Sequence, residues 1–66
     1  RSSRRSDPGF PDLVLVRGHR LIFAELKREK GRLTESQRIW LAALEETAET
    51  HVWRPSDWEA VIEVLA

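Results

Sequence analysis

Two acidic residues stand at the outer ends of the two most apolar stretches of the chain, and a lysine follows the second acid. Asp12 comes directly before one stretch, Glu25 lies near the end of the other, and Lys27 is two residues further on. Mg²⁺ favours one or two carboxylates and leaves room for a substrate phosphate. A bound cation acidifies a coordinated water, and a nearby amine can orient that water or neutralise developing charge. These side chains could hydrolyse a phosphodiester if the fold brings them together.

A hairpin would bring them together. Gly18 and His19 separate the apolar runs 13–16 and 21–26, and Gly at the first central position fits a two-residue type II′ turn. In that register Asp12 faces Glu25, and opposed residues share one face with Cβ atoms about 4.5–5.5 Å apart. Lys27, two residues on, lies on the same face. A four-residue loop keeps this register, whereas a three-residue loop would shift it by one.

Opposed carboxylates destabilise a sheet, and a divalent cation would compensate. Each signal by itself is common: Glu-x-Lys occurs often by chance, and Pro-Asp often only begins a strand. Their joint occurrence at opposed positions, with apolar strands between them, is what makes the prediction specific.

The rest of the chain predicts the elements that hold this hairpin. Thr34 and Gln37 form a capping box that begins a helix with an apolar face to about residue 48, and residues 50–53 form a third strand. Ser56 and Glu59 predict a second capping box, and Trp58 belongs to an i, i+3, i+4, i+7 stripe expected to be buried. The order strand, strand, helix, strand, helix predicts an α/β (α+β) fold with a small mixed sheet.

Size and composition narrow the class of protein. A chain of 66 residues makes one domain at most and buries only about 60% of its unfolded surface, so oligomerisation is the usual remedy. There is no cysteine, which excludes disulfides and Cys-based zinc sites. No apolar run approaches the roughly 20 residues of a membrane span, and no secretory signal is visible, so a cytoplasmic protein of phage or bacterial type is expected.

The charges are sorted along the chain. Residues 1–33 hold nine Lys/Arg against four acids, which gives +5, and residues 34–66 hold two Arg against seven acids, which gives −5. The first half is a candidate polyanion-binding surface, although an ordinary solvated surface would fit the same count.

The stretch from Gly9 to about Leu65 resembles the PD-(D/E)xK nuclease superfamily, and most closely its VRR-NUC branch, which is similar to Holliday-junction resolvases. Pro11-Asp12 stands for the PD motif, and Glu25-Leu26-Lys27 for (D/E)xK. The resemblance implies a restriction-endonuclease-like core over residues 9–66. The chain departs from the family in having no N-terminal helix before this core, because the composition of residues 1–8 predicts only a basic arm or loop.

The resemblance also implies the roles of the site residues. Asp12, Glu25 and the backbone carbonyl of Leu26 would bind Mg²⁺ or Mn²⁺, Lys27 would assist catalysis, and Gln37 is a recurrent active-site position. Gln37 has a competing structural role in its capping box, and the two roles need not exclude each other.

Basic and aromatic residues outside the motif complete the prediction. Arg28, Lys30 and Arg32 follow it in a loop and could contact DNA phosphates, which requires cations but no reading of sequence. Arg1, Arg4 and Arg5 could track a backbone or form a solvated tail. His19 and His51 have no ligand spacing and are given no role. Trp40 and Trp58 are expected in the core, and Trp53 in the sheet or at a subunit interface.

The prediction is therefore a Mg²⁺- or Mn²⁺-dependent endonuclease acting on DNA, including branched DNA, as a homodimer or higher homo-oligomer without a membrane partner. The alternative is a catalytically incomplete module on the same scaffold that binds nucleic acid or only self-associates.

Overall fold

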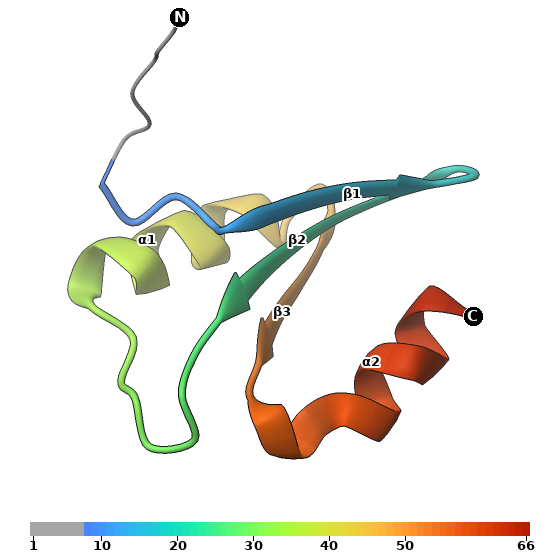
Figure 1. Cartoon of the computed structure of the whole chain (residues 1–66). Coiled ribbons are helices and arrows are strands. Elements are labelled where there is room, and N and C mark those ends of the chain that lie inside the picture. The colour runs from blue at the N-terminus through green and yellow to red at the C-terminus, as the bar shows by residue number, and fades with distance from the viewer. Residues whose placement is uncertain (1–7) are drawn as a thin grey trace, which may run out of the picture.

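The computed structural model describes residues 8–66, so the predicted basic arm with Arg1, Arg4 and Arg5 lies outside the described residues. These residues form a mixed α+β fold with a three-stranded sheet, two α-helices and one 3₁₀ turn (Figure 1), as the sequence predicts. In chain order the elements are β1 (Leu13–Arg17), β2 (Arg20–Leu26), α1 (Glu35–Leu44), β3 (Glu49–Trp53), the 3₁₀ turn Pro55–Asp57 and α2 (Trp58–Leu65).

The hairpin of β1 and β2 has the predicted register. Leu15 pairs with Ile22, and the ladder runs from Leu13 opposite Ala24 to Arg17 opposite Arg20. Gly18 has a φ of +59°, and no non-glycine residue between 8 and 66 has a positive φ. A positive φ at the first central residue alone is the mark of a type II′ turn, so the prediction of turn and register is confirmed.

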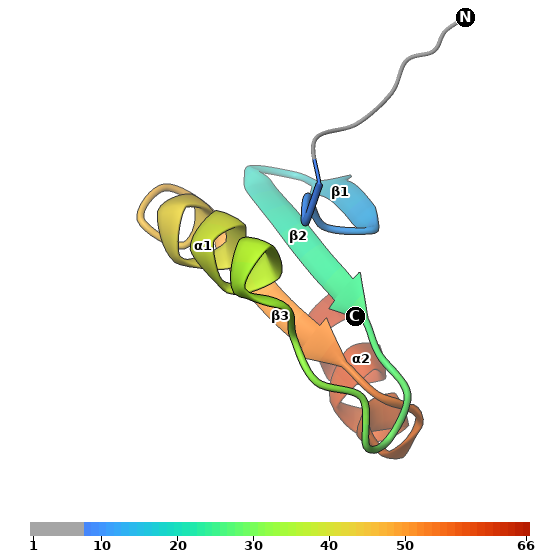
Figure 2. The same ribbon diagram turned by 90° about the vertical axis from the view of Figure 1, so that its left-hand side faces the viewer.

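The third strand completes a sheet in the order β1-β2-β3, with β3 parallel to β2. The crossover between them carries α1, and Figure 2 shows α1 and α2 on opposite sides of the sheet. Four consecutive residues of β2, from Ile22 to Glu25, are buried. A central strand covered on both faces needs a continuous rather than an alternating apolar run.

Aromatic side chains pack between the sheet and α1. The Phe10 ring lies edge-on to Phe23, with centroids 5.8 Å apart, and edge-on to Trp40, with centroids 5.0 Å apart. Such T-shaped pairs favour the edge-to-face arrangement of ring quadrupoles. Trp40 is half-buried there, and Phe10 anchors the segment that leads into β1.

The start of α2 differs from the prediction. The Ser56–Glu59 capping box does not form, because Ser56 donates its backbone N–H and its hydroxyl to the Glu29 carboxylate. A 3₁₀ turn comes first, and α2 begins at Trp58. Trp58 remains 67% exposed, so its predicted place in the core is wrong. Trp58 lines an open groove beside the sheet instead of entering the core.

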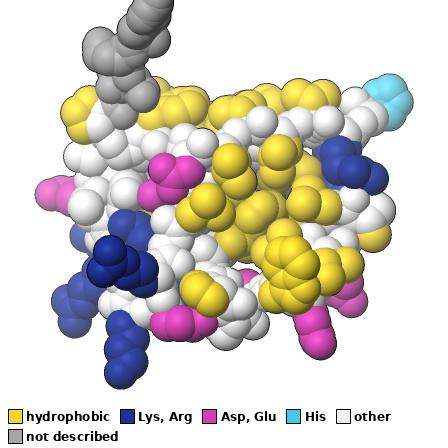
Figure 3. Space-filling model, in the orientation of Figure 1, with side chains coloured by type: hydrophobic (Ala, Val, Ile, Leu, Met, Phe, Trp, Pro, Cys, Tyr) yellow, Lys and Arg dark blue, Asp and Glu magenta, His cyan; other side chains and the backbone are white. Residues whose placement is uncertain are grey.

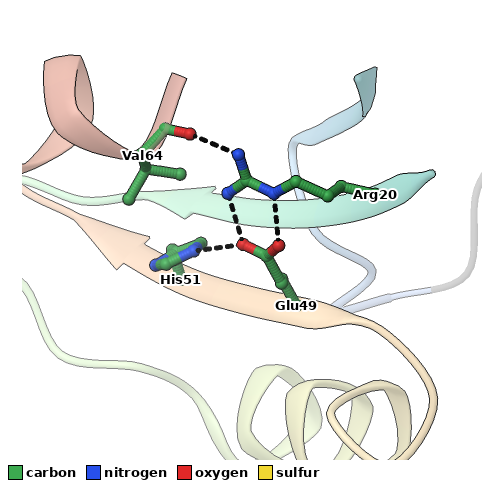
Figure 4. A network of polar contacts seen from close by, with 4 residues as sticks. All are labelled: Arg20, Glu49, His51 and Val64. Atoms are coloured by element: carbon green, nitrogen blue, oxygen red, sulfur yellow. Dashed lines mark hydrogen bonds and ion pairs between the residues drawn. The ribbon is translucent and has the colours of Figure 1, made fainter. Parts of the chain in front are cut away.

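An ion-pair network joins the last turns of α2 to the sheet (Figure 4). The Arg20 guanidinium donates to both carboxylate oxygens of Glu49, at 2.6 and 2.8 Å, and to the Val64 carbonyl at 2.9 Å. Glu49 also lies 3.5 Å from His51 Nε2. Arg17 stands opposite Arg20 in the hairpin, so Glu49 offsets an otherwise unfavourable pair of like charges. His51 thus has a structural contact, while His19 is an exposed turn residue.

An open apolar groove of about 430 Å³ lies between the sheet and α2. Figure 3 shows hydrophobic side chains spread over this face. Trp53 ends β3, is 8% exposed and forms part of the groove wall, so it packs in the sheet, which is one of the two predicted places. The other lining residues are Leu13, Leu15, Leu26, Lys27, Arg54, Pro55, Trp58, Val61 and Leu65. No helix within residues 8–66 is long and apolar enough to cross a membrane.

Candidate active site

The site begins with Asp12, which is fixed at the end of the hairpin ladder. The pairing of Leu13 with Ala24 sets Asp12 opposite Glu25 one step further on. The Asp12 side chain then turns along the strand end, and its Oδ2 accepts a hydrogen bond from the Leu26 backbone N–H at 3.0 Å. This bond holds the exposed carboxylate beside the Glu-Leu-Lys segment that the sequence links to it.

Glu25 is the buried carboxylate of the site, with only 4% of its surface exposed. Its Oε2 accepts a hydrogen bond from Gln37 Nε2 at 2.8 Å. Its Oε1 is buried and has no hydrogen-bond partner, which is found for no other side-chain nitrogen or oxygen in residues 8–66. Buried polar atoms are nearly always paired, so an orphaned carboxylate oxygen points to a function or a missing ligand.

Neighbouring charges act on the same carboxyl. Burial raises the pKa of Glu25 above its usual 4.5, and the negative charge of Asp12 raises it further. The Lys27 amine opposes this rise, so it is close enough to stabilise the ionised form. Lys27 is half-buried, with part of its side chain along the apolar groove. The charges of Asp12 and Lys27 therefore both act on the ionisation of Glu25, in opposite directions.

Gln37 forms the predicted capping box, and its side chain also contacts Glu25. Its Oε1 accepts from the Thr34 backbone N–H at 2.8 Å, and the Thr34 hydroxyl accepts from the Gln37 backbone N–H at 3.1 Å. These bonds form the predicted capping box. Because the amide oxygen is engaged by Thr34, the NH₂ group is directed at Glu25. The cap that begins α1 also fixes one oxygen of the buried carboxylate.

Gly9 is a positioning residue that the sequence does not single out. Its φ is +85°, and a Cβ placed on it would lie 2.6 Å from Ser36 Cβ and 2.8 Å from the Gln37 nitrogen. Only glycine allows this close approach to the first turn of α1. The segment before β1 is thereby held against the helix that carries Gln37. The only signal in the sequence is the Pro8-Gly9 pair, which reads as an ordinary turn.

The predicted phosphate-binding cations stand on the loop that leaves the site. Arg28, Lys30 and Arg32 are exposed, and Figure 3 shows Lys and Arg side chains gathered over the loop after β2. Arg54, from the end of β3, reaches under this loop and bonds two of its carbonyls. The sequence gives no sign of that role.

The donor set is small but suits a hard divalent cation. The parts of the chain described here contain no group of three or more His, Cys, Asp or Glu that could hold a metal. They do contain an orphaned carboxylate oxygen on Glu25 and a second carboxylate on Asp12. Mg²⁺ is commonly bound by one or two carboxylates and several waters, so the residues present fit such an ion.

The described residues thus form a small mixed-sheet domain with two carboxylates and a lysine at the end of a hairpin. The model of the VRR-NUC domain family matches residues 1–57. The chain belongs to this family, whose members are nuclease domains of the PD-(D/E)xK superfamily. Membership implies a nuclease acting on DNA, and nucleases of this family usually need a divalent metal. Neither the curated proteins nor the solved structures contain a match.

Proposed function

We propose that the domain is a Mg²⁺- or Mn²⁺-dependent endonuclease whose cation is held by Asp12, Glu25 and the Leu26 carbonyl. The observation that carries the proposal is the orphaned, buried Oε1 of Glu25 beside the carboxylate of Asp12. Two acids held together are unfavourable for the metal-free protein, and Lys27 offsets only part of the cost, because the pKa of Glu25 remains raised. A cation site requires such a pair of neighbouring carboxylates.

The other site residues act on the carboxylates and on the attacking water. Gln37 holds Oε2 of Glu25, so that Oε1 stays free as a ligand. Lys27 orients the attacking water or neutralises charge on the phosphate as a P–O bond breaks. The cation, when bound, acidifies water and stabilises charge on a phosphodiester oxygen. Arg28, Lys30 and Arg32 hold the flanking phosphates of the DNA.

The small number of donors supports one alternative. Within residues 8–66 no third acidic or histidine ligand joins Asp12 and Glu25. A site with two carboxylates could therefore be catalytically incomplete and leave a module that binds nucleic acid without cutting it, or only self-associates. This reading predicts salt-dependent DNA binding with no cleavage in any divalent metal, or no DNA binding at all.

The exposed apolar groove supports self-association. Leu26 and Trp58 in the groove are 49% and 67% exposed, and Val16 on the edge strand β1 is 71% exposed. An exposed apolar edge strand beside an apolar groove can form an interface with another chain. We propose a homodimer or higher homo-oligomer, to be tested by light scattering across a concentration series. A monomer at all concentrations would contradict it.

A metal titration combined with a nuclease assay tests the proposed activity. Duplex, single-stranded and branched DNA are incubated with the protein in Mg²⁺, Mn²⁺, Ca²⁺ and EDTA. Cleavage in Mg²⁺ or Mn²⁺ but not in EDTA supports the endonuclease, and faster cleavage of branched DNA supports structure specificity. DNA binding without cleavage in every metal supports the incomplete module.

A further inference from the structure

Arg54 bonds the backbone of the cationic loop, residues 27–33, that follows β2. Its Nη1 donates to the carbonyls of Arg28 and Gly31, each at 2.7 Å, and the Gly31 N–H donates to the Arg28 carbonyl at 3.1 Å. Arg54 itself is half-buried and also lines the apolar groove. Charge-assisted hydrogen bonds of this kind are among the stronger ones in proteins. The guanidinium therefore fixes the turn formed by residues 28–31.

A second contact, between Glu29 and Ser56, fixes the same loop. The Glu29 carboxylate accepts the backbone N–H of Ser56 and, at 2.9 Å, its hydroxyl. Both contacts join the loop after β2 to residues 54–56, which follow β3. The ends of the two parallel strands are also joined directly, because the Lys27 N–H donates to the Trp53 carbonyl at 2.9 Å. The loop is thus tied at three points to the segment 53–56, which runs from the end of β3 into the 3₁₀ turn.

The two contacts orient the charges of the loop. Arg54 and Glu29 are engaged with backbone and hydroxyl groups, whereas Arg28, Lys30 and Arg32 are exposed. A loop fixed in its bound shape loses less conformational entropy when it meets a ligand. Arg54 is a cation near the predicted DNA surface, yet its side-chain hydrogen bonds go to the carbonyls of the loop itself.

We propose that Arg54 and the Glu29–Ser56 contact preorganise the loop 27–33 for DNA phosphates, and that Arg54 is a positioning residue that makes no phosphate contact of its own. This rests on the proposed function, in which the loop binds DNA. It goes further by dividing the basic residues into those that contact the backbone and one that shapes the loop.

The salt dependence of DNA binding separates the two roles. Each side chain that neutralises a phosphate contributes about 0.9 to the slope of log K against log salt. Arg54→Gln and Arg28→Gln remove the same charge and form a matched pair. Arg28→Gln should reduce the slope by about 0.9. Arg54→Gln should weaken binding about 2- to 10-fold at every salt concentration with an unchanged slope, as expected for lost ordering of a side chain or loop.

Two further variants control for charge and folding. Both Arg54 bonds come from one nitrogen, so the ammonium of Arg54→Lys can replace them and should restore most of the affinity. Ser56→Ala removes one loop contact without changing charge, and should weaken binding slightly at an unchanged slope. Ser56 is exposed, so this variant keeps the fold.

DNA binding is measured by fluorescence anisotropy of a labelled duplex in EDTA, over a salt range of about 50 to 300 mM, which defines the slope. Hydrogen exchange of the Gly31 amide is measured in the free protein. Faster Gly31 exchange and weaker binding at unchanged slope in Arg54→Gln support the inference. A slope reduced as in Arg28→Gln, or unchanged affinity, overturns it. If the wild type binds no DNA, the proposed function fails instead, while Gly31 exchange still shows whether Arg54 orders the loop.

Discussion

Replacing Glu25 by Gln should stabilise the metal-free protein at neutral pH. The ionised Glu25 is 4% exposed, leaves Oε1 without a partner and lies beside the charge of Asp12. A glutamine keeps the shape, and its oxygen can still accept from Gln37. Its NH₂ group then occupies the position of Oε1 and can donate to Asp12, so a repulsion becomes an attraction.

The expected gain in stability follows from the unpaired Oε1 of Glu25. A buried acceptor without a partner costs about 1–3 kcal/mol, and Glu25→Gln recovers part of this cost if the new amide donates to Asp12. A gain of about 1 kcal/mol in the free energy of unfolding is therefore expected for Glu25→Gln at pH 7. For a domain of this size, that raises Tm by about 4–8 °C.

The pH dependence has a definite sign. The pKa of Glu25 is raised in the folded state, so the stability linked to its protonation is fully present below the usual value of 4.5. That stability is lost as pH rises through the raised pKa. Wild type and Glu25→Gln should accordingly be equally stable below pH 4.5, diverge as pH rises through the raised pKa, and differ by a constant amount above it.

Thermal unfolding by circular dichroism in EDTA, at pH 4 and pH 7, measures the effect. Glu46→Gln is the control, because it makes the same chemical change at an exposed position. Addition of Mn²⁺ should reverse the order at pH 7, since a ligand of the native state stabilises only the protein that binds it. A Glu25→Gln protein less stable than wild type in EDTA at pH 7 would refute the reasoning.

Three further perturbations test the supports of the site and the sheet. Thr34→Ala should cost about 1 kcal/mol in urea unfolding, because it removes the N-cap of α1; no loss would show that the cap is dispensable. Gly9→Ala should cost about 1–3 kcal/mol and weaken Mn²⁺ affinity, since its φ is +85° and its Cβ would meet Ser36; a neutral substitution would contradict the tight approach. The pKa of Glu49 is lowered to about 2, chiefly by the hydrogen bond that Arg20 donates to it. This pair therefore stabilises the fold above pH 4.5, and the stability is lost as pH falls towards 2. Glu49→Gln should flatten acid unfolding monitored by fluorescence between pH 4.5 and 2, and an unchanged acid transition would contradict this assignment.

The hairpin could be predicted because its determinants are local. A glycine at the first turn position fixes the turn type, and the turn fixes the register of the ladder from Leu13 to Ala24. Asp12 and Glu25 follow from that register alone. The capping box of α1 was equally readable, because Thr34 and Gln37 are three residues apart in sequence.

The remaining features depend on contacts between distant segments. Ser56 was predicted to cap a helix, but a carboxylate 27 residues away competes for the same groups. Trp58 follows the periodicity of a buried stripe but is exposed, because periodicity does not report how closely a helix packs on the sheet. Gln37 donates to Glu25 where Gly9 and the aromatic contacts of Phe10 hold the segment before β1 between α1 and β2. No pattern in a single sequence contains these distances.

Mn²⁺-dependent cleavage by three proteins tests most directly whether the two carboxylates hold a catalytic cation. Wild type, Asp12→Asn and Lys27→Ala are compared on the same DNA, with Mn²⁺ binding followed in parallel by electron paramagnetic resonance. We expect cleavage by wild type alone, with Mn²⁺ binding lost in Asp12→Asn and kept in Lys27→Ala. Equal cleavage by all three proteins would contradict the assignment of the site.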